Sequence, residues 1–192
     1  HMEQEFFASI NPRMRRMLKS VVLPNLPPVV NERRDVEMSP KQKRAYNQMR
    51  DHMIAEIEDG SYLTAPSPLT QTIRLLQFAS SYAEMTYDEE GVPSTTLIEP
   101  SNKVDAFMDD IKSGDFGGDS VAVSAVSKQL INLLSARLTK EKIEHGLITG
   151  DIEEHDRQRA VDDFQSGKTK FILFTAQAGG VGITLTKARW LV

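Results

Sequence analysis

The sequence has no cysteine and no long hydrophobic run among its 192 residues. Without cysteine there is no disulfide framework, so nothing indicates an oxidising compartment. No apolar stretch approaches the ~20 residues that a membrane span needs, and no secretory signal is visible. We therefore expect a soluble globular chain inside the cell, in the cytoplasm or nucleus, with no membrane partner.

Net positive charge is also lacking. The formal charge is −4 at pH 7, which argues weakly against a nucleic-acid binder. The charges are unevenly distributed, however, because residues 1–50 carry 10 Lys and Arg against 5 Asp and Glu, whereas residues 51–110 carry 2 against 12. The basic start of the chain can contact an anionic partner, or its arginines can be solvated within a linker. Both interpretations stay open.

Changes in composition divide the chain into three predicted segments. His1-Met2 is typical of an expression-tag remnant, and residues 1–38 are predicted to hold this remnant, a basic arm and a linker. Residues 39–118 are predicted to be a mostly helical segment. Residues 119–192 change to alternating strands and helices, which predicts a separate sheet-based domain.

The first two segments are expected to contain one strand and three helices, over residues 29–38, 39–59, 67–85 and 101–114. Ser39 followed by Pro40 is a strong helix start, because Ser caps a helix and Pro fits its first turn. A polar loop is expected over residues 88–99. Tyr46, Met49 and other apolar residues at helical spacing predict a core-facing stripe.

The last segment is expected to contain strands over 121–125, 145–148, 171–174 and 189–192, with helices between them, one of them over 153–165. Strand–helix–strand order with short connections predicts a parallel sheet with right-handed crossovers, an α/β fold. Trp190 is expected in the core. A domain rarely ends on an unpaired apolar strand, so we expect the sequence to be part of a longer protein.

One loop of the sheet has a composition that suits phosphate binding. A buried strand ends at Thr175 and runs directly into Gly179, Gly180 and Gly182. Such a loop presents bare backbone N–H groups at the carboxyl edge of a sheet, where open α/β sheets bind ligands. The same glycines could instead serve only left-handed turns.

The segment Gly167-Lys168-Thr169 resembles the end of a phosphate-binding P-loop, but Asp162 stands where the motif needs its first glycine. The segment also joins a helix to a strand, which is the reverse of the required order. It is therefore predicted to end a helix, with Gly167 as the stop. The sequence thus contains no complete nucleotide site of its own.

An acidic cluster offers an alternative chemistry. Asp151, Glu154 and His155, with the neighbouring carboxylates, could hold a divalent metal for phosphodiester hydrolysis, which would make the chain a metal-dependent nuclease. Carboxylates in the first turn of a helix can also do no more than oppose its positive dipole end.

Taken together, these segments resemble the C-terminal RecA-like lobe of Swi/Snf-type superfamily-two DNA helicases and translocases. The resemblance rests on Arg15-Arg16 with the Pro-rich stretch after it, Met38-Ser-Pro-Lys-Gln42, Val121 to Ser124, Gly150 with Arg157, and Thr175 to Leu185. Thr149 stands where the family often has an acid, and Thr184-Leu185 where it usually has Asn-Leu. The family's motif six, with its arginines, would lie beyond Val192.

The resemblance implies a RecA-like parallel sheet flanked by helices and a motor that closes two lobes around ATP and Mg²⁺ while gripping DNA. It implies no catalytic residue in this chain, a partner in an N-terminal RecA-like lobe outside this sequence, and ATP turnover only with that lobe. The implied DNA-backbone contacts are Ser124, Lys128, Gly150, Arg157, Thr175, Gly179 and Gly180, with Gly182 and Thr184 toward the nucleotide and the lobe interface.

Several of these residues could instead have a purely structural role. Ser124 and Thr175 could cap strand ends, because hydroxyls readily bond local backbone. Arg157 could tie its helix to neighbouring carboxylates. A non-catalytic docking module for DNA or protein is a further alternative to the motor.

Overall fold

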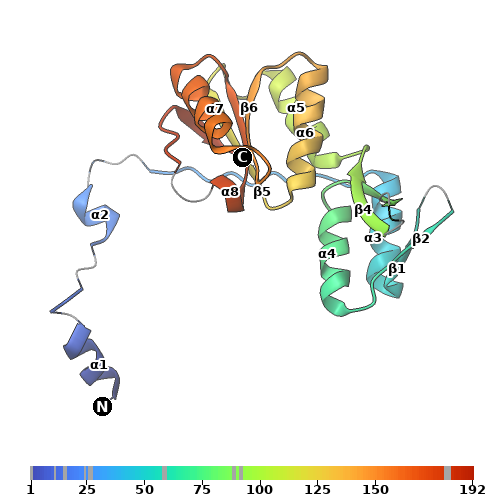
Figure 1. Cartoon of the computed structure of the whole chain (residues 1–192), viewed down its shortest axis with the longest axis horizontal. Coiled ribbons are helices and arrows are strands. Elements are labelled where there is room, and N and C mark those ends of the chain that lie inside the picture. The colour runs from blue at the N-terminus through green and yellow to red at the C-terminus, as the bar shows by residue number, and fades with distance from the viewer. Residues whose placement is uncertain are drawn as a thin grey trace. The chain divides into compact units, whose positions relative to one another are not determined.

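The structure of the chain is a computed structural model that describes residues 2–10, 12–14, 17–23, 25, 28–57, 60–87, 90, 93–179 and 183–192. Residues up to Asp35 form one compact unit, and residues Val36–Val192 form another. Figure 1 labels the helices and strands of both units.

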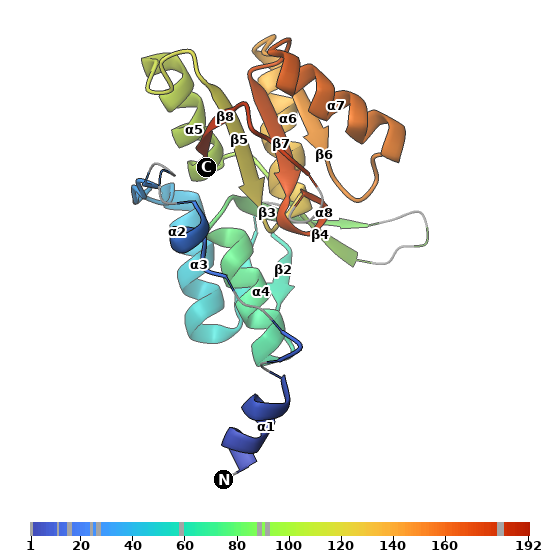
Figure 2. The ribbon, with the colours of Figure 1, turned by 90° about the vertical axis from the view of Figure 1, so that its left-hand side faces the viewer.

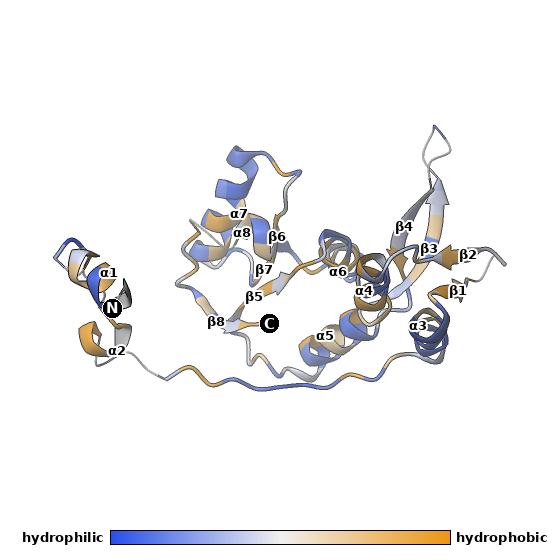
Figure 3. Ribbon diagram, turned by 90° about the horizontal axis from the view of Figure 1, so that it is seen from below, coloured by the Kyte–Doolittle hydropathy of each residue, from blue (hydrophilic) through white to orange (hydrophobic). Residues whose placement is uncertain are grey.

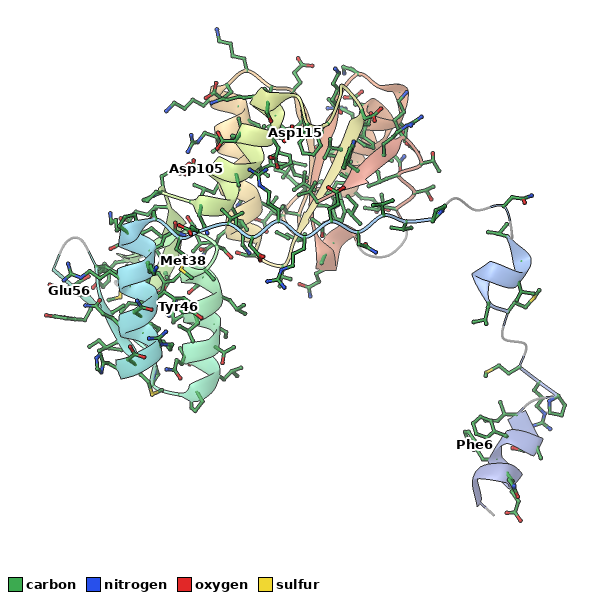
Figure 4. The ribbon with its side chains drawn as sticks, turned by 180° about the vertical axis from the view of Figure 1, so that it is seen from behind. Phe6, Met38, Tyr46, Glu56, Asp105 and Asp115 are labelled. Carbon is green, nitrogen blue, oxygen red and sulfur yellow. The ribbon has the colours of Figure 1, made fainter. Side chains whose placement is uncertain are left out.

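The first unit contains two short helices, α1 (Met2–Ile10) and α2 (Lys19–Val22). Large apolar side chains are exposed on it, including Phe6 on α1, which Figure 4 labels. The strand expected over residues 29–38 is wrong, since these residues join none of the sheets. A β-branched composition without a neighbouring strand to pair with does not make a strand. Arg15 and Arg16 lie outside the described residues.

The second unit opens with α3 (Pro40–His52), whose start is the one expected. The Ser39 hydroxyl accepts from the Gln42 N–H and the Gln42 side chain accepts from the Ser39 N–H, which is a capping box. The expected continuation of this helix to Asp59 is wrong, because Met53 adopts the left-handed conformation (φ 58°) and ends the helix. Gly60, which follows the expected helix, lies in a later turn with φ 78°.

Two short hairpins replace parts of the predicted helices and loop. Strand β1 (Ile54–Glu56) pairs antiparallel with β2 (Tyr62–Thr64). Helix α4 (Pro68–Phe78) ends well before residue 85, and β3 (Tyr82–Tyr87) follows it. β3 pairs antiparallel with β4 (Pro93–Ile98), inside the region expected to be a loop. These strands place Leu63, Ala83 and Leu97 in the core cluster that they share with α3 and α4.

The core of this part holds a fully buried amide. Gln42 donates to the Phe78 carbonyl (3.2 Å) and to Asn102 Oδ1 (2.9 Å), and its Oε1 also accepts from the Asn102 N–H (3.3 Å). These contacts join the starts of α3 and α5 to the end of α4. Around them pack apolar side chains, including Met49, Phe78 and Leu97. The predicted core stripe is confirmed for Met49, which is fully buried.

The remaining elements follow the expected order. Helix α5 (Asn102–Ser113) begins at the predicted Ser101 cap and ends at Gly114 in the left-handed conformation (φ 80°). After it come β5 (Ser120–Ala125), α6 (Lys128–Lys140), β6 (His145–Ile148), α7 (Glu154–Ser166), β7 (Phe171–Thr175), α8 (Ala176–Gly179) and β8 (Ala188–Leu191). The four strands form one parallel sheet in the order β6-β7-β5-β8, so the predicted α/β fold with a RecA-like parallel sheet is confirmed.

Both faces of this sheet are covered, which agrees with the continuous burial of β7. Val121 and Leu173 face the cluster that α5 and α6 cover, while Ala122 and Ile172 face the cluster that α7 covers. Figures 1 and 2 show the sheet between these two sets of helices. Helix α7 lies very close to β6, because a Cβ added to Gly146 would fall 3.2 Å from the Ala160 Cβ.

Helix α6 also holds the β3–β4 hairpin to the sheet. The Gln129 side chain accepts from the Leu97 N–H (3.0 Å) and donates to the Thr95 carbonyl (2.8 Å), so it pairs with β4 as a neighbouring strand would. Farther along the helix, Arg137 donates to Glu99 (2.8 Å) and to Asp105 of α5 (2.9 Å), which Figure 4 labels. Glu99 is the main cause of the raised pKa of Arg137.

Exposure differs from expectation at the edge of the sheet. Trp190 of β8 is 38% exposed and packs edge-on against Phe116 (5.8 Å between centroids), so its predicted place in the core is wrong. It covers the core from the rim because β8 is an edge strand.

The helices differ in the polarity of their surfaces. Figure 3 shows α3 as largely hydrophilic, whereas α4 carries apolar stretches, of which Leu69 and Leu76 are exposed. In the portion of the chain described, no helix combines the length and the apolar character that crossing a bilayer requires.

Candidate nucleic-acid interface

The strand register brings three of the predicted contact loops to one rim of the sheet. Ser124 of β5 is paired with Phe174 of β7, and Ile148 of β6 is paired with the same Phe174. Since all three strands are parallel, the loops that follow them leave from the same carboxyl rim. This rim is where open parallel sheets bind their ligands.

The loop after β5 supplies a hydroxyl and a cation. Ser124 is partly exposed, and its N–H donates to the Val192 carbonyl (2.7 Å). Ser127 caps α6 by accepting from the Leu130 N–H (3.3 Å), and Lys128 is the first residue of that helix. The Lys128 ammonium forms an ion pair with Asp151 in the loop after β6. The positive end of the helix dipole and the ammonium therefore lie together at this corner of the rim.

The loop after β6 is held in shape by Arg157. Its guanidinium donates to the Ile152 carbonyl (2.7 Å) and to the Gly150 carbonyl (3.2 Å). Gly150 itself is exposed, with no atom within 4 Å of a Cβ built on it. Arg157 thus fixes the backbone around Gly150. The alternative prediction was that Arg157 ties its helix to neighbouring carboxylates. Arg157 does tie α7 to the preceding loop, but its acceptors are the backbone carbonyls of Gly150 and Ile152.

The loop after β7 begins with two residues whose local contacts explain their identity. Thr175 is buried, and its hydroxyl accepts from the Ala178 N–H (3.3 Å), so it caps the single turn of α8. A Cβ on Gly179 would fall 2.8 Å from Cγ of Phe174, closer than real side chains approach one another. Gly179 is therefore required by close packing rather than by a left-handed turn. Gly180 and Gly182 lie outside the described residues.

The returning half of the same loop is held by a residue that sequence reasoning missed. Gln165, in the last turn of α7, donates to the Thr184 carbonyl (3.0 Å) and to the Thr186 hydroxyl (3.0 Å). Its Oε1 accepts from the Lys187 N–H (2.9 Å). Nothing local marks Gln165 in the sequence, because its partners follow about 20 residues later. Thr184, predicted near the lobe interface, is exposed.

A cleft of about 800 Å³ separates α7 from this loop. It is lined by Ile152, Glu153, Glu154, Arg157, Gln158, Val161, Ala178, Ile183 and Thr184. Glu153 and Glu154 stand at the first turn of α7, where they oppose the positive dipole end. The two carboxylates make this side of the rim less suited to phosphate than the corner at Lys128.

The residues of the proposed metal site do not come together. Asp151 is paired with Lys128, and His155 lies 3.5 Å from its neighbour Asp156. His145, the next histidine toward the start of the chain, is bonded through both ring nitrogens, to Ser135 Oγ (2.7 Å) and to the Ile143 carbonyl (2.9 Å). Over the described residues, no three His, Asp or Glu side chains gather around a possible ion. The geometry thus lends no support to the metal-dependent nuclease.

The described residues also do not fit a complete nucleotide site with its Mg²⁺. Gly167 has φ 82° and ends α7, as predicted from the sequence, so Gly167-Lys168-Thr169 is not a phosphate loop. The Lys168 ammonium is paired with Asp163 (3.0 Å), and the Thr169 side chain is buried.

Comparisons with known proteins agree with this architecture. Residues 102–192 match the family described as the helicase conserved C-terminal domain. The SNF2 domain-containing protein ENL1 of Oryza sativa subsp. japonica is 28% identical over 113 residues, which cover 58% of this chain and 11% of that protein. The ATP-dependent RNA helicase DBP5 of Kluyveromyces lactis is 28% identical over 127 residues, which cover 56% of this chain and 27% of that protein.

One solved structure shares the fold over almost the whole chain. The Sulfolobus solfataricus SWI2/SNF2 ATPase core in complex with dsDNA superposes with a TM-score of 0.60 at 21% identity, covering 98% of this chain and 40% of that one. The chain thus spans less than half the length of each of these similar proteins. Residues 102–192 are thus similar to the helicase conserved C-terminal domain, and the chain shares its fold with a SWI2/SNF2 ATPase core, in agreement with the resemblance seen in the sequence.

Proposed function

We propose that this chain is the C-terminal lobe of an ATP-dependent DNA helicase or translocase and that it holds the nucleic-acid backbone along the carboxyl rim of its sheet. The observation that carries the proposal is the corner at Lys128. There an ammonium, the amino end of a 13-residue helix and the exposed Gly150 loop meet at one rim. Backbone amides, hydroxyls and one cation suit phosphates without reading sequence.

The path of the backbone follows from the charges at the rim. The first turn of α6 contains Lys128 and no acidic residue, so its dipole attracts phosphate. The first turn of α7 contains Glu154 and Asp156, which oppose a phosphate. We place the backbone over Ser124, Lys128 and Gly150 for this reason. Thr175, Gly179 and Arg157 then act indirectly, by shaping the loops. For Gly180 we propose a direct contact with the backbone.

DNA is the proposed ligand because the rice relative is named for an SNF2 domain and the similar archaeal core was solved with dsDNA. RNA is the competing ligand, since a yeast relative is named as an RNA helicase. ATP and Mg²⁺ are proposed to bind chiefly to an N-terminal RecA-like lobe. Gly182 and Thr184 are proposed to face that lobe. The proposed location of the whole protein is inside the cell, where its nucleic-acid substrate lies.

Binding is tested by fluorescence anisotropy with duplex DNA, single-stranded DNA and RNA of equal length and random sequence. We expect duplex DNA to bind most tightly and its affinity to fall steeply between about 50 and about 200 mM salt. Salt-independent or undetectable binding to all probes would instead favour the docking module. Tighter binding to RNA would replace DNA as the ligand.

ATP turnover separates the lobe from a complete motor. The chain alone is expected to hydrolyse ATP no faster than buffer, and DNA-stimulated turnover is expected only after a first lobe and the downstream arginine motif are joined to it. Robust DNA-stimulated turnover by these residues alone would show that the assignment as a half-motor is wrong.

A further inference from the structure

An apolar groove of about 700 Å³ opens between three helices of the second unit. Helices α4, α5 and α6 line it together with the carboxyl end of β5, and Figure 3 shows the three helices beside one another. Two of the lining side chains, Leu76 and Val126, are 64% and 93% exposed, so the groove is open to solvent. A broad apolar surface in contact with water is typical of a docking site.

The outer side of α4 extends this surface with the spacing of a helix-packing seam. Leu69, Ile73 and Leu76 are all exposed, and they follow one another at intervals of four and three residues. Residues at this spacing lie along one side of a helix and insert between the side chains of a second helix laid against it. The other side of α4 is already occupied, since Leu75 and Phe78 pack in the core cluster shared with α3. The exposed side therefore has the form that accepts a helix.

Helices α5 and α6 present matching apolar side chains to the same groove. Val104 and Phe107 are three residues apart on α5, and Leu130 and Leu134 are four residues apart on α6. Each pair thus comes from adjacent turns of its helix. A helix lying in the groove would contact apolar side chains of all three helices, which is the helix-in-groove mode of peptide recognition.

The charges at the groove indicate the sign of its occupant. Among the described residues, Lys103 is the only charged one that lines the groove, and it is exposed. Arg74 stands beside the groove and donates to the side chain of the lining residue Gln77 (3.0 Å). Burial lowers the pKa of Arg74, and within the described chain no carboxylate is paired with Arg74 or Lys103. Two cations without an acid favour an anionic partner.

We propose that this groove binds an acidic amphipathic helix of a partner protein, which places apolar side chains between α4, α5 and α6 and a carboxylate at Lys103. The spacing of the exposed side chains makes the occupant a helix, and the cations make it acidic. The proposal goes beyond the proposed function, because the groove shares only Ser124 with the proposed path of the nucleic-acid backbone.

The probe for the experiment is a fluorescein-labelled peptide of about 15 residues, with Leu at intervals of four and three residues, Glu beside them and Ala elsewhere. Its reference is a peptide of the same composition in scrambled order. Fluorescence anisotropy with the whole chain is expected to give a Kd on the order of 10 μM for the amphipathic peptide. The scrambled peptide is expected to bind at least about tenfold more weakly, because its apolar side chains do not share one side of a helix.

Two exposed positions test the groove without disturbing the core. Leu76→Ser is expected to weaken binding of the peptide about five- to tenfold, and Tyr62→Ser, which changes an exposed residue of β2 outside the groove, serves as its control. Lys103→Glu is expected to weaken binding about tenfold and to restore it for a peptide with Lys in place of Glu. Lys112→Glu on the same helix is the matched control, because Lys112 is exposed and does not line the groove.

Each outcome decides the proposal. An amphipathic peptide that shows no saturable binding, or that binds no better than its scrambled form, overturns it. Binding that Leu76→Ser or Lys103→Glu leaves unchanged does the same. Light scattering of the chain alone tests a second copy as the occupant: a dimer that Leu76→Ser abolishes would replace the partner protein. Binding of duplex DNA, measured in parallel, should not respond to Leu76→Ser, so the proposed function and the groove fail or hold separately. Circular dichroism of each variant excludes unfolding as the cause.

Discussion

The ammonium of Lys128, at the start of α6, is paired with the carboxylate of Asp151 in the loop after β6, at the same rim of the sheet. Both side chains are substantially exposed, so the pair contributes little to stability. Its consequence is electrostatic instead. In the free chain the cation that we propose to meet a phosphate already has an anionic neighbour, with which the phosphate would have to compete.

Removing that neighbour should strengthen binding. Asp151→Asn is expected to raise the affinity for duplex DNA by roughly two- to fivefold at low salt, because a competing carboxylate is lost and Lys128 is released. Titration by fluorescence anisotropy measures the change. A loss of affinity would instead mean that Asp151 orients Lys128 for its contact, and the competition would be refuted.

Removing the cation should have the opposite effect. Lys128→Gln is expected to weaken DNA binding about three- to tenfold and to lower the slope of log affinity against log salt by about one. Lys112→Gln is the matched control: it removes the same charge near the end of α5, which leads to the amino ends of the strands. Equal slopes for both variants would place the backbone elsewhere.

Gly179 and Phe174 predict a stability effect that needs no ligand. Gly179→Ala should lower the free energy of unfolding by about 1–3 kcal/mol, since the new methyl would overlap the Phe174 ring. Gly150→Ala, where the added methyl meets open space, should change it by less than about 0.5 kcal/mol. Denaturant unfolding measures both.

A second change separates this overlap from a general loop effect. In Gly179→Ala combined with Phe174→Leu, the loss should be smaller than the sum of the single losses by at least about 0.5 kcal/mol. Strict additivity would mean that the ring is not the obstacle.

The buried amide of Gln42 predicts a larger loss. Gln42→Met keeps the volume but leaves Asn102 Oδ1 and the Phe78 carbonyl without their donor, so the free energy of unfolding should fall by about 2–3 kcal/mol. Gln48→Met is the control, since Gln48 is only partly buried and accepts a single bond from the Glu56 N–H. Thermal or denaturant unfolding compares the two variants. An equal fall in the free energy of unfolding would show that the buried hydrogen bonds of Gln42 do not stabilise the fold more than the exposed one of Gln48.

Much of the second half of the chain could be predicted from the sequence, because its signals are local. The strand at 171–175 is a continuous apolar run, Ser101 and Gly114 mark both ends of α5, and Gly167 marks the end of α7. Each signal lies within a few residues of the element that it defines. Parallel pairing then follows from strand–helix alternation, which also placed the contact loops at one rim.

The hairpins and the fine structure of the site could not be predicted in this way. Strands β1 and β2 have only three residues each, and all four strands of the hairpins contribute to the core cluster that α3 and α4 share. Gln165 and its partners are about 20 residues apart, and the contact between Lys128 and Asp151 spans a strand and a helix. A single sequence carries no signal for such contacts.

Helix α6 carries Lys128 at its first position, Gln129 on β4 next to it, and Arg137 on Glu99 farther along. If nucleic acid binds at Lys128 as proposed, a force on it would act on the whole of α6. Because Gln129 of this helix is bonded to β4, the same force would displace the β3–β4 hairpin.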